Sequence, residues 1–172
     1  MKAVAAVLAT VLALALQTTL ARFLTLGTFA VDLVLVVVVY IALTGGAVSG
    51  LLTGTFAGLI QDALTPGSSV IGIGGLAKTI VGFLTGVIGT QFIVSQTLPR
   101  FVVFFGATLL HALVFMGLYV SFGLRTFSSP YAAITGQALG NAVMGIVLFQ
   151  IAEFLPGAVE RRRIARGGRV RR

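Results

Sequence analysis

The sequence contains no cysteine, no tryptophan, one histidine and four acidic residues. Without cysteine, neither a disulfide framework nor a thiolate metal site is available. One histidine and four acids cannot build a zinc site of the usual kinds, so we expect no metal and no cofactor. Charged residues make up 9% of the chain, against about 25% in an ordinary soluble domain. These absences exclude disulfide scaffolds and zinc enzymes, and they argue against a soluble protein.

Hydrophobic residues take the place of the missing charges. They make up 58% of the chain, and the mean hydropathy is +1.09. A chain of 172 residues has room for five or six membrane spans of roughly 20 residues, with short loops and no separate soluble domain. We therefore expect an all-α polytopic membrane protein.

The net charge of +8 is concentrated at the C-terminus. A basic run placed directly after a membrane span meets anionic lipid first, so we predict a lipid-contacting tail and no nucleic-acid site. This divides the chain into a membrane domain, residues 1–156, and a basic cytoplasmic tail, residues 157–172. The tail arginines are Arg161, Arg162, Arg163, Arg166, Arg169, Arg171 and Arg172.

The first twenty residues resemble a signal peptide, with Lys2 followed by an apolar run. We expect them to be retained as a first membrane helix. The doubtful element is Asp32–Leu43, which is shorter than a full span. Keeping it separate gives six spans and puts both termini in the cytoplasm, as the distribution of basic residues favours. The predicted spans are 3–21, 32–43, 46–62, 70–90, 101–122 and 131–155, with a loop at 91–100 that Pro99 closes.

Glycines recur every four residues before Asp62, and a second row of small residues surrounds Lys78. Positions four apart lie on one ridge of a helix, and small residues on that ridge let membrane helices approach closely. The pattern predicts close helix packing at both rows. The first row comprises Gly46, Gly50, Gly54 and Gly58, and the second Gly74, Lys78, Gly82 and Gly86.

Four polar residues, Gln17, Asp32, Asp62 and Lys78, are predicted to converge near the outer side of the membrane. A lysine at the centre of a membrane helix costs roughly 2.5 to 3.5 kcal/mol, so Lys78 should face protein and find a partner. Two interpretations stay open. One is a structural ion pair between Asp62 and Lys78. The other is an outward-facing polar cavity that binds a ligand or a side chain of a partner.

Two further polar groups lie within predicted spans. His111 is expected to hydrogen-bond to another helix, because its own helix has no acidic residue for a proton relay. On the last span, Gln137 and Asn141 lie four apart, next to Gly136 and Gly140. This face is suited to an interhelical contact, either inside the bundle or with a partner helix.

Several of these residues form a recognisable series. Gln17 is late in the first helix, and Val31-Asp32-Leu33 opens an aliphatic run that ends in Tyr40-Ile-Ala-Leu. The segment Gly54-x-x-x-Gly58-Leu-Ile-Gln-Asp62-Ala-Leu is followed ten residues later by Gly72. This order and spacing resembles the rod shape-determining protein MreD family of bacterial inner-membrane proteins. The resemblance extends to about Gly86, and it departs from the family at Val31, where a proline is expected.

The resemblance implies a non-enzymatic scaffold of the cell-elongation machinery that binds MreC. Through MreC it would be linked to MreB filaments and to the wall synthases, RodA and its partner transpeptidase. The implied fold is six helices similar to the substrate-binding S-component of energy-coupling vitamin transporters. That similarity supplies the alternative, a vitamin-binding subunit whose energising partner docks on Ala5, Ala9 and Ala13. A catalytic Ser–Lys dyad of Ser68 or Ser69 with Lys78 has no supporting local motif, so we expect no enzyme.

Overall fold

A computed structural model describes residues 2–19, 25–26, 29–65, 70–92, 96–124, 126–127 and 130–167. The described residues form six helices and one pair of two-residue strands. The prediction of an all-α membrane protein is confirmed. The helices are α1 (Lys2–Thr19), α3 (Leu33–Gly45), α4 (Ala47–Leu64), α5 (Ile73–Gln91), α6 (Thr97–Ser121) and α7 (Tyr131–Gly167). The strands are β1 (Thr25–Leu26) and β2 (Phe29–Ala30), paired antiparallel.

Four of these helices are long and apolar enough to cross a membrane by length and composition. They are α4, α5, α6 and residues Tyr131–Phe154 of α7. The apolar segment of α1, Val4–Thr19, is shorter, and α3, with 13 residues, extends only about 20 Å. Its short length is compatible with a membrane protein because the helix is enclosed by its neighbours: Val34, Val38 and Val39 are fully buried.

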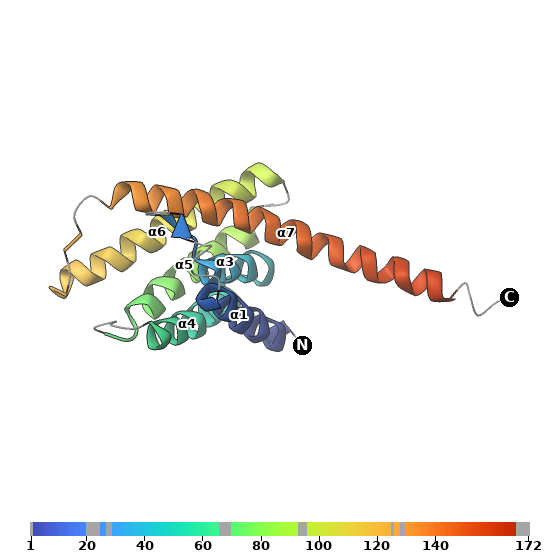
Figure 1. The fold of residues 1–172 in the computed structure, drawn as a ribbon, viewed down its shortest axis with the longest axis horizontal. Coiled ribbons are helices and arrows are strands. Elements are labelled where there is room, and N and C mark those ends of the chain that lie inside the picture. The colour runs from blue at the N-terminus through green and yellow to red at the C-terminus, as the bar shows by residue number, and fades with distance from the viewer. Residues whose placement is uncertain are drawn as a thin grey trace.

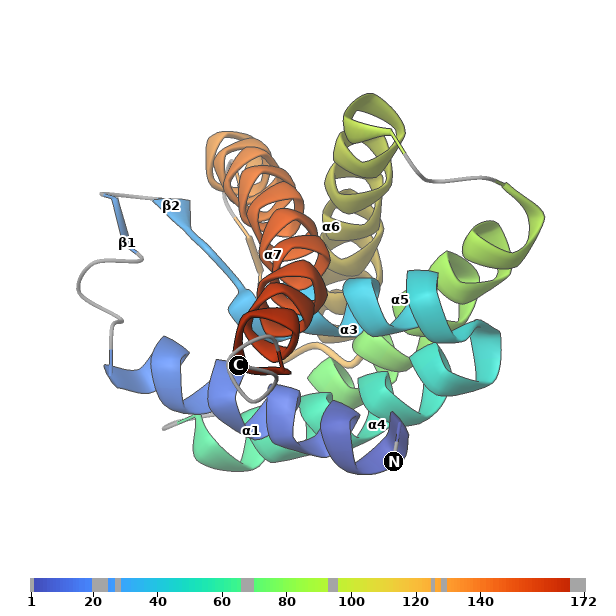
Figure 2. The ribbon, with the colours of Figure 1, turned by 90° about the vertical axis from the view of Figure 1, so that its right-hand side faces the viewer.

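Helix α3 lies in the middle of the bundle. Figure 2 shows α1 and α4 on one side of it and α6 and α7 on the other. Its two faces belong to two separate apolar clusters. Val34 and Val38 pack with Ala13 and Leu14 of α1, whereas Leu35 and Val39 of the opposite face pack with residues of α5, α6 and α7. The periodicity of this helix is weak because both of its faces are core.

The connection between α3 and α4 is a single residue, Gly46. Its φ of 86° lies in the left-handed region that favours glycine, and its N–H donates to the carbonyl oxygen of Ala42. Gly46 is therefore not part of the helical ridge, but it does pack closely against α5, because a Cβ on Gly86 would lie 2.6 Å from its carbonyl carbon. The ridge begins at Gly50, because the chain must turn sharply at Gly46 before α4 can start.

Two prolines that were predicted to lie outside the spans, Pro99 in the loop before the fifth span and Pro156 just after the last, lie within helices. Pro99 lies in the first turn of α6, where its missing N–H would have no intrahelical partner, so the helix begins at Thr97. Pro156 lies inside α7, and the helix continues to Gly167. A proline in a helix interior removes one hydrogen bond, and the good helix formers that follow it continue the helix. Figure 1 shows the C-terminal part of α7 extending past the rest of the bundle.

Candidate functional site

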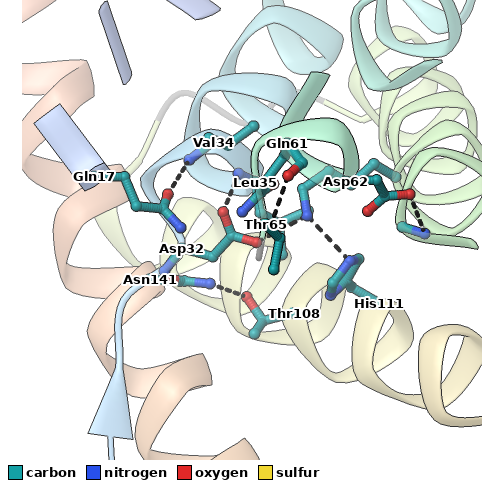
Figure 3. A network of polar contacts seen from close by, with 12 residues as sticks. Gln17, Asp32, Val34, Leu35, Gln61, Asp62, Thr65, Thr108, His111 and Asn141 are labelled. Carbon is teal, nitrogen blue, oxygen red and sulfur yellow. Dashed lines mark hydrogen bonds and ion pairs between the residues drawn. The ribbon is translucent and has the colours of Figure 1, made fainter. Parts of the chain in front are cut away.

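The buried ion pair of the bundle joins Lys78 to Asp32. Lys78 Nζ lies 2.9 Å from Asp32 Oδ2, and the side chains are only 4% and 7% exposed. His111 Nε2 lies 3.2 Å from the same Nζ (Figure 3). Three helices, α5, α3 and α6, thus meet at one ammonium. Because an ammonium only donates hydrogen bonds, Nε2 of His111 is the acceptor and the imidazole is neutral, with its proton on Nδ1.

The predicted ion pair between Asp62 and Lys78 is wrong. Asp62 Oδ2 accepts hydrogen bonds from the N–H groups of Gly72, Gly74 and Gly75, at 2.8, 3.0 and 3.2 Å. These groups belong to the N-terminus of α5, where backbone donors lack intrahelical acceptors and the helix dipole favours a negative charge. Asp62 therefore caps a neighbouring helix.

The N-terminus of α3 is completed by its own N-cap, Asp32, and by side chains from two other helices. Asn141 Oδ1 of α7 accepts from the Asp32 N–H at 2.9 Å, and Gln17 Oε1 of α1 accepts from the Val34 N–H at 3.2 Å. Asp32 Oδ1 accepts from the Leu35 N–H at 3.0 Å. These N–H groups have no acceptor within the helix and no water in a hydrocarbon environment, so the side chains are needed where they lie.

Asn141 holds a second element through its amide nitrogen. Its Nδ2 donates to Thr108 Oγ1 of α6 at 3.1 Å, and the residue is fully buried. Of the two contacts that the sequence left open for Asn141, inside the bundle or with a partner helix, the structure has the first, because the residue lies inside the bundle. Thr108 was not singled out in the sequence. Its spacing of three residues from His111, which puts both on one helix face, is the signal that points to it.

We call Asp32, Lys78, His111, Asn141, Thr108 and Gln17 the polar network. It lies at the end of the bundle where α3 and α5 begin and where α1 and α4 end, which we call the network end. The four residues that were predicted to converge all lie at this one end; they are Gln17, Asp32, Asp62 and Lys78. Asp62 stands beside the network, on the terminus of α5.

The two glycine rows face each other and make the most extensive helix contact of the described chain, between α4 and α5. A Cβ on Gly50 would clash with the carbonyl oxygen of Gly82, and a Cβ on Gly54 with that of Lys78. Across the same contact the hydroxyls of Thr55 and Thr79 lie 2.8 Å apart. We call this contact the glycine seam; it comprises Gly50, Gly54 and Gly58 of α4 and Gly74, Gly75, Gly82 and Gly86 of α5.

The remaining predicted residues of α7 are distributed around the network. A Cβ on Gly140 would lie 2.9 Å from Val31 Cγ2, so this glycine packs against the segment that leads into α3. Gln137 lines a cavity described below, and Gly136 is half-buried. In the predicted tail, Arg161–Arg163 and Arg166 belong to α7, whereas Arg169, Arg171 and Arg172 lie outside the described residues. The loop residues Ser68 and Ser69 also lie outside them.

A cavity of about 330 Å³, which we call the polar cavity, lies next to the polar network, between α4, α5, α6 and α7. Lys78, Asp32 and His111 form part of its wall, together with Asp62, Gln61 and Gln137. One side is aromatic: the rings of His111 and Phe115 stack at 5.8 Å, and those of Phe115 and Tyr119 lie 4.7 Å apart.

A second, larger hollow of about 840 Å³ lies at the other end of α1. It is bounded by the N-terminal half of α1, the C-terminal half of α3 and the N-terminal half of α4, and we call it the apolar groove. Its walls combine small residues, such as Ala5, Ala9 and Ser49, with the large apolar side chains of Leu52 and Phe56.

Comparison with known families identifies the kind of protein to which this architecture belongs. A family model described as rod shape-determining protein MreD matches residues 1–156, nine-tenths of the chain. The chain belongs to the MreD family. Its apolar helices make it an integral membrane protein of this rod-shape-determining family. No curated protein and no solved structure matches the chain, so the likeness to transporter S-components stays a prediction.

Proposed function

We propose that this MreD-family chain is a non-enzymatic scaffold subunit of the cell-elongation machinery in the bacterial inner membrane, and that it binds MreC directly. Contacts with MreB, RodA and its transpeptidase partner are then indirect. Both termini lie in the cytoplasm in this proposal, with the network end facing outward. The observation that carries the proposal is the family match over residues 1–156.

The chemistry of the buried polar groups supports a scaffold. Asp32 neutralises Lys78, and Asp62, Gln17 and Asn141 complete helix termini. Each of these groups has a structural use that holds two helices together. A hydrolase or transferase would instead direct a nucleophile and a base at a common point in an accessible site.

The internal use of the glycine seam and of Asn141 restricts where a partner helix binds. Both are used in packing within the bundle, so neither is available to a partner helix. Among the residues that the structure describes, the apolar groove is a hollowed surface that combines small residues with exposed large ones. Leu52 is 61% exposed there, beside the half-buried Ala9. Because small residues allow close approach of helices in membranes, we propose that the membrane helix of MreC lies in this groove.

Co-purification with MreC tests the proposal. A tag on full-length MreC should recover the wild-type chain in mild detergent. Ala9→Trp fills the apolar groove and should prevent recovery, whereas the matched Val11→Trp on the same helix, at a residue 49% exposed that does not line the groove, should not. Failure to recover a folded, inserted wild-type chain would overturn the scaffold proposal.

The arginine tail has a separate role in this proposal, contact with anionic lipid. A chain truncated after Arg163 should bind vesicles containing anionic lipid less well than the full chain, because each basic residue near such a surface contributes about 1 kcal/mol. It should still be recovered with MreC. Loss of the complex on truncation would assign the tail to partner binding instead.

The second candidate function, a vitamin-binding S-component, is favoured by the polar cavity at the network end. The predicted docking site on Ala5, Ala9 and Ala13 supports this function less than expected. Ala13 is only 4% exposed and packs in the core. Such a subunit retains a small molecule through purification and does not need MreC, which distinguishes it from the scaffold.

A further inference from the structure

We propose that the polar cavity binds a small organic cation, specifically a primary ammonium attached to an apolar body. This goes beyond the scaffold function, which does not require any ligand. The cavity has a volume of about 330 Å³. A water molecule takes about 30 Å³ of liquid volume, so this space holds a compact organic molecule rather than a single water.

The charge of the cavity wall favours a cation. Asp32 and Asp62 contribute two negative charges and Lys78 one positive charge. With His111 neutral, as its contact with the Lys78 ammonium requires, the wall carries a net charge of −1 from these ionisable side chains. A net negative charge in a site walled by protein attracts a cation.

The aromatic side of the cavity supplies a second attraction. Phe115 and Tyr119 lie one turn apart on α6, both half-buried, and both line the cavity. Faces of such rings attract an ammonium by the cation–π interaction and also accommodate an apolar body. Met116, between them on the same helix, adds a further apolar surface that adapts to different shapes.

An unsatisfied acceptor on the cavity wall points to a ligand with N–H donors. Gln61 lines the cavity, and among the residues that the structure describes its buried Oε1 has no hydrogen-bond partner. Buried acceptors are normally paired. A primary ammonium brings three N–H donors, so a rotation of the Gln61 amide toward it would satisfy this oxygen.

The experiment uses two soluble probes of similar size and opposite charge, phenethylammonium and phenylacetate. Binding to the purified full-length chain is measured by calorimetry, and folding is checked by gel filtration. We expect phenethylammonium to bind at least about tenfold more tightly than phenylacetate. Tighter binding of phenylacetate, or no binding of phenethylammonium to the folded wild-type chain, would overturn the proposal.

Two pairs of variants locate the binding. Ala133→Trp fills the cavity and should abolish binding, whereas Ala132→Trp, at an adjacent exposed residue that does not line it, should leave binding unchanged. Gln137→Lys should weaken phenethylammonium by roughly tenfold or more through charge repulsion, whereas Gln137→Glu should strengthen it. Equal effects of the two tryptophan variants, or insensitivity to charge at Gln137, would contradict the assignment.

A primary ammonium can come from the bilayer or from solution. Short-chain phosphatidylethanolamine and phosphatidylglycerol of the same chain length distinguish these sources. Displacement of phenethylammonium by the ethanolamine lipid alone identifies a lipid headgroup as the ligand. Displacement by free ethanolamine but not by the lipid identifies a soluble amine. Displacement by phosphatidylglycerol would contradict a cation site.

Discussion

Lys78 in α5 and Asp32 at the start of α3 form a buried ion pair with Nζ and Oδ2 2.9 Å apart. The pair connects α5, the most buried of the four candidate membrane spans, to the short helix in the middle of the bundle. Because Asp32 also caps α3 through the Leu35 N–H, a single carboxylate determines both where α3 begins and where it sits against α5. The network end therefore depends on this one residue more than on any other.

Neutralising one member of the pair should destabilise the protein strongly. Lys78→Met leaves a buried carboxylate without its counter-charge and should lower the free energy of unfolding by about 3 to 5 kcal/mol. The double variant Lys78→Met with Asp32→Asn should lose less than the sum of the two single changes. Unfolding of the wild type, the two single variants and the double variant in mixed detergent micelles measures these free energies.

The pair between Arg100, whose side chain is 11% exposed, and the more exposed Glu153 provides the control. Glu153 is 59% exposed in this pair, so Glu153→Gln should change the free energy of unfolding by no more than about 1 kcal/mol. The structural role of the buried pair would be contradicted if the changes in unfolding free energy at Lys78 and Asp32 were additive. It would also be contradicted if Lys78→Met and Glu153→Gln changed that free energy equally.

The glycine seam predicts a steep dependence on side-chain size. A Cβ on Gly54 would clash with the carbonyl of Lys78, so Gly54→Ala should cost about 1 to 3 kcal/mol through displaced backbone. At Gly117 nothing lies within 4 Å of the added Cβ, and Gly117→Ala should be neutral or slightly stabilising. Thermal unfolding of the two variants makes the comparison, and similar behaviour would show that the seam has no special role.

Asn141 should be irreplaceable by an apolar residue of similar size. Asn141→Leu leaves the buried Asp32 N–H without its acceptor, at a cost of about 1 to 3 kcal/mol. It also removes the N–H donor to Thr108 Oγ1, whose own hydroxyl still donates to the carbonyl oxygen of Phe104. Gln150→Leu, at an exposed position of the same helix, is the matched control. If both variants unfold at the same temperature as the wild type, the amide of Asn141 is not needed to hold α3.

Much of this fold was predictable because the relevant signals are local. The spacing of the glycines and the length of the apolar runs depend only on helix geometry, and both gave helices close to those observed. The partner of Lys78 was not predictable in the same way. Asp32 and Asp62 both lie at the network end, and the choice between them depends on the relative rotation of α3, α4 and α5.

The face of α7 that carries Asn141 shows a second limit. In a membrane protein, lipid is as apolar as the core, so hydropathy does not distinguish an inward face from an outward one. The buried position of Asn141 follows from the unpaired N–H at the start of α3, which is a tertiary relationship. The beginning of α6 and the end of α7 were predicted wrongly because Pro99 and Pro156 were placed outside the helices, whereas each helix accommodates its proline.

Cysteine labelling tests the proposed orientation. The chain contains no cysteine, so single substitutions report one position each. Cysteines at Ser68 and Ser129, which lie outside the described residues, should react with a membrane-impermeant reagent from outside the cell, and one at Gly168 should not. Labelling of Gly168 from outside would place the basic tail on the wrong side of the membrane.

Cross-linking between the apolar groove and MreC tests the proposed scaffold function most directly. Single cysteines at Ala9 and Leu52 line the groove, and a cysteine at Leu76, 49% exposed on α5, lies away from it. With cysteines scanned along the membrane helix of MreC in intact membranes, we predict disulfide cross-links to Ala9→Cys and Leu52→Cys and none to Leu76→Cys. Cross-links confined to Leu76→Cys would contradict the groove, and the absence of any cross-link at all three positions would contradict direct binding of MreC through this face.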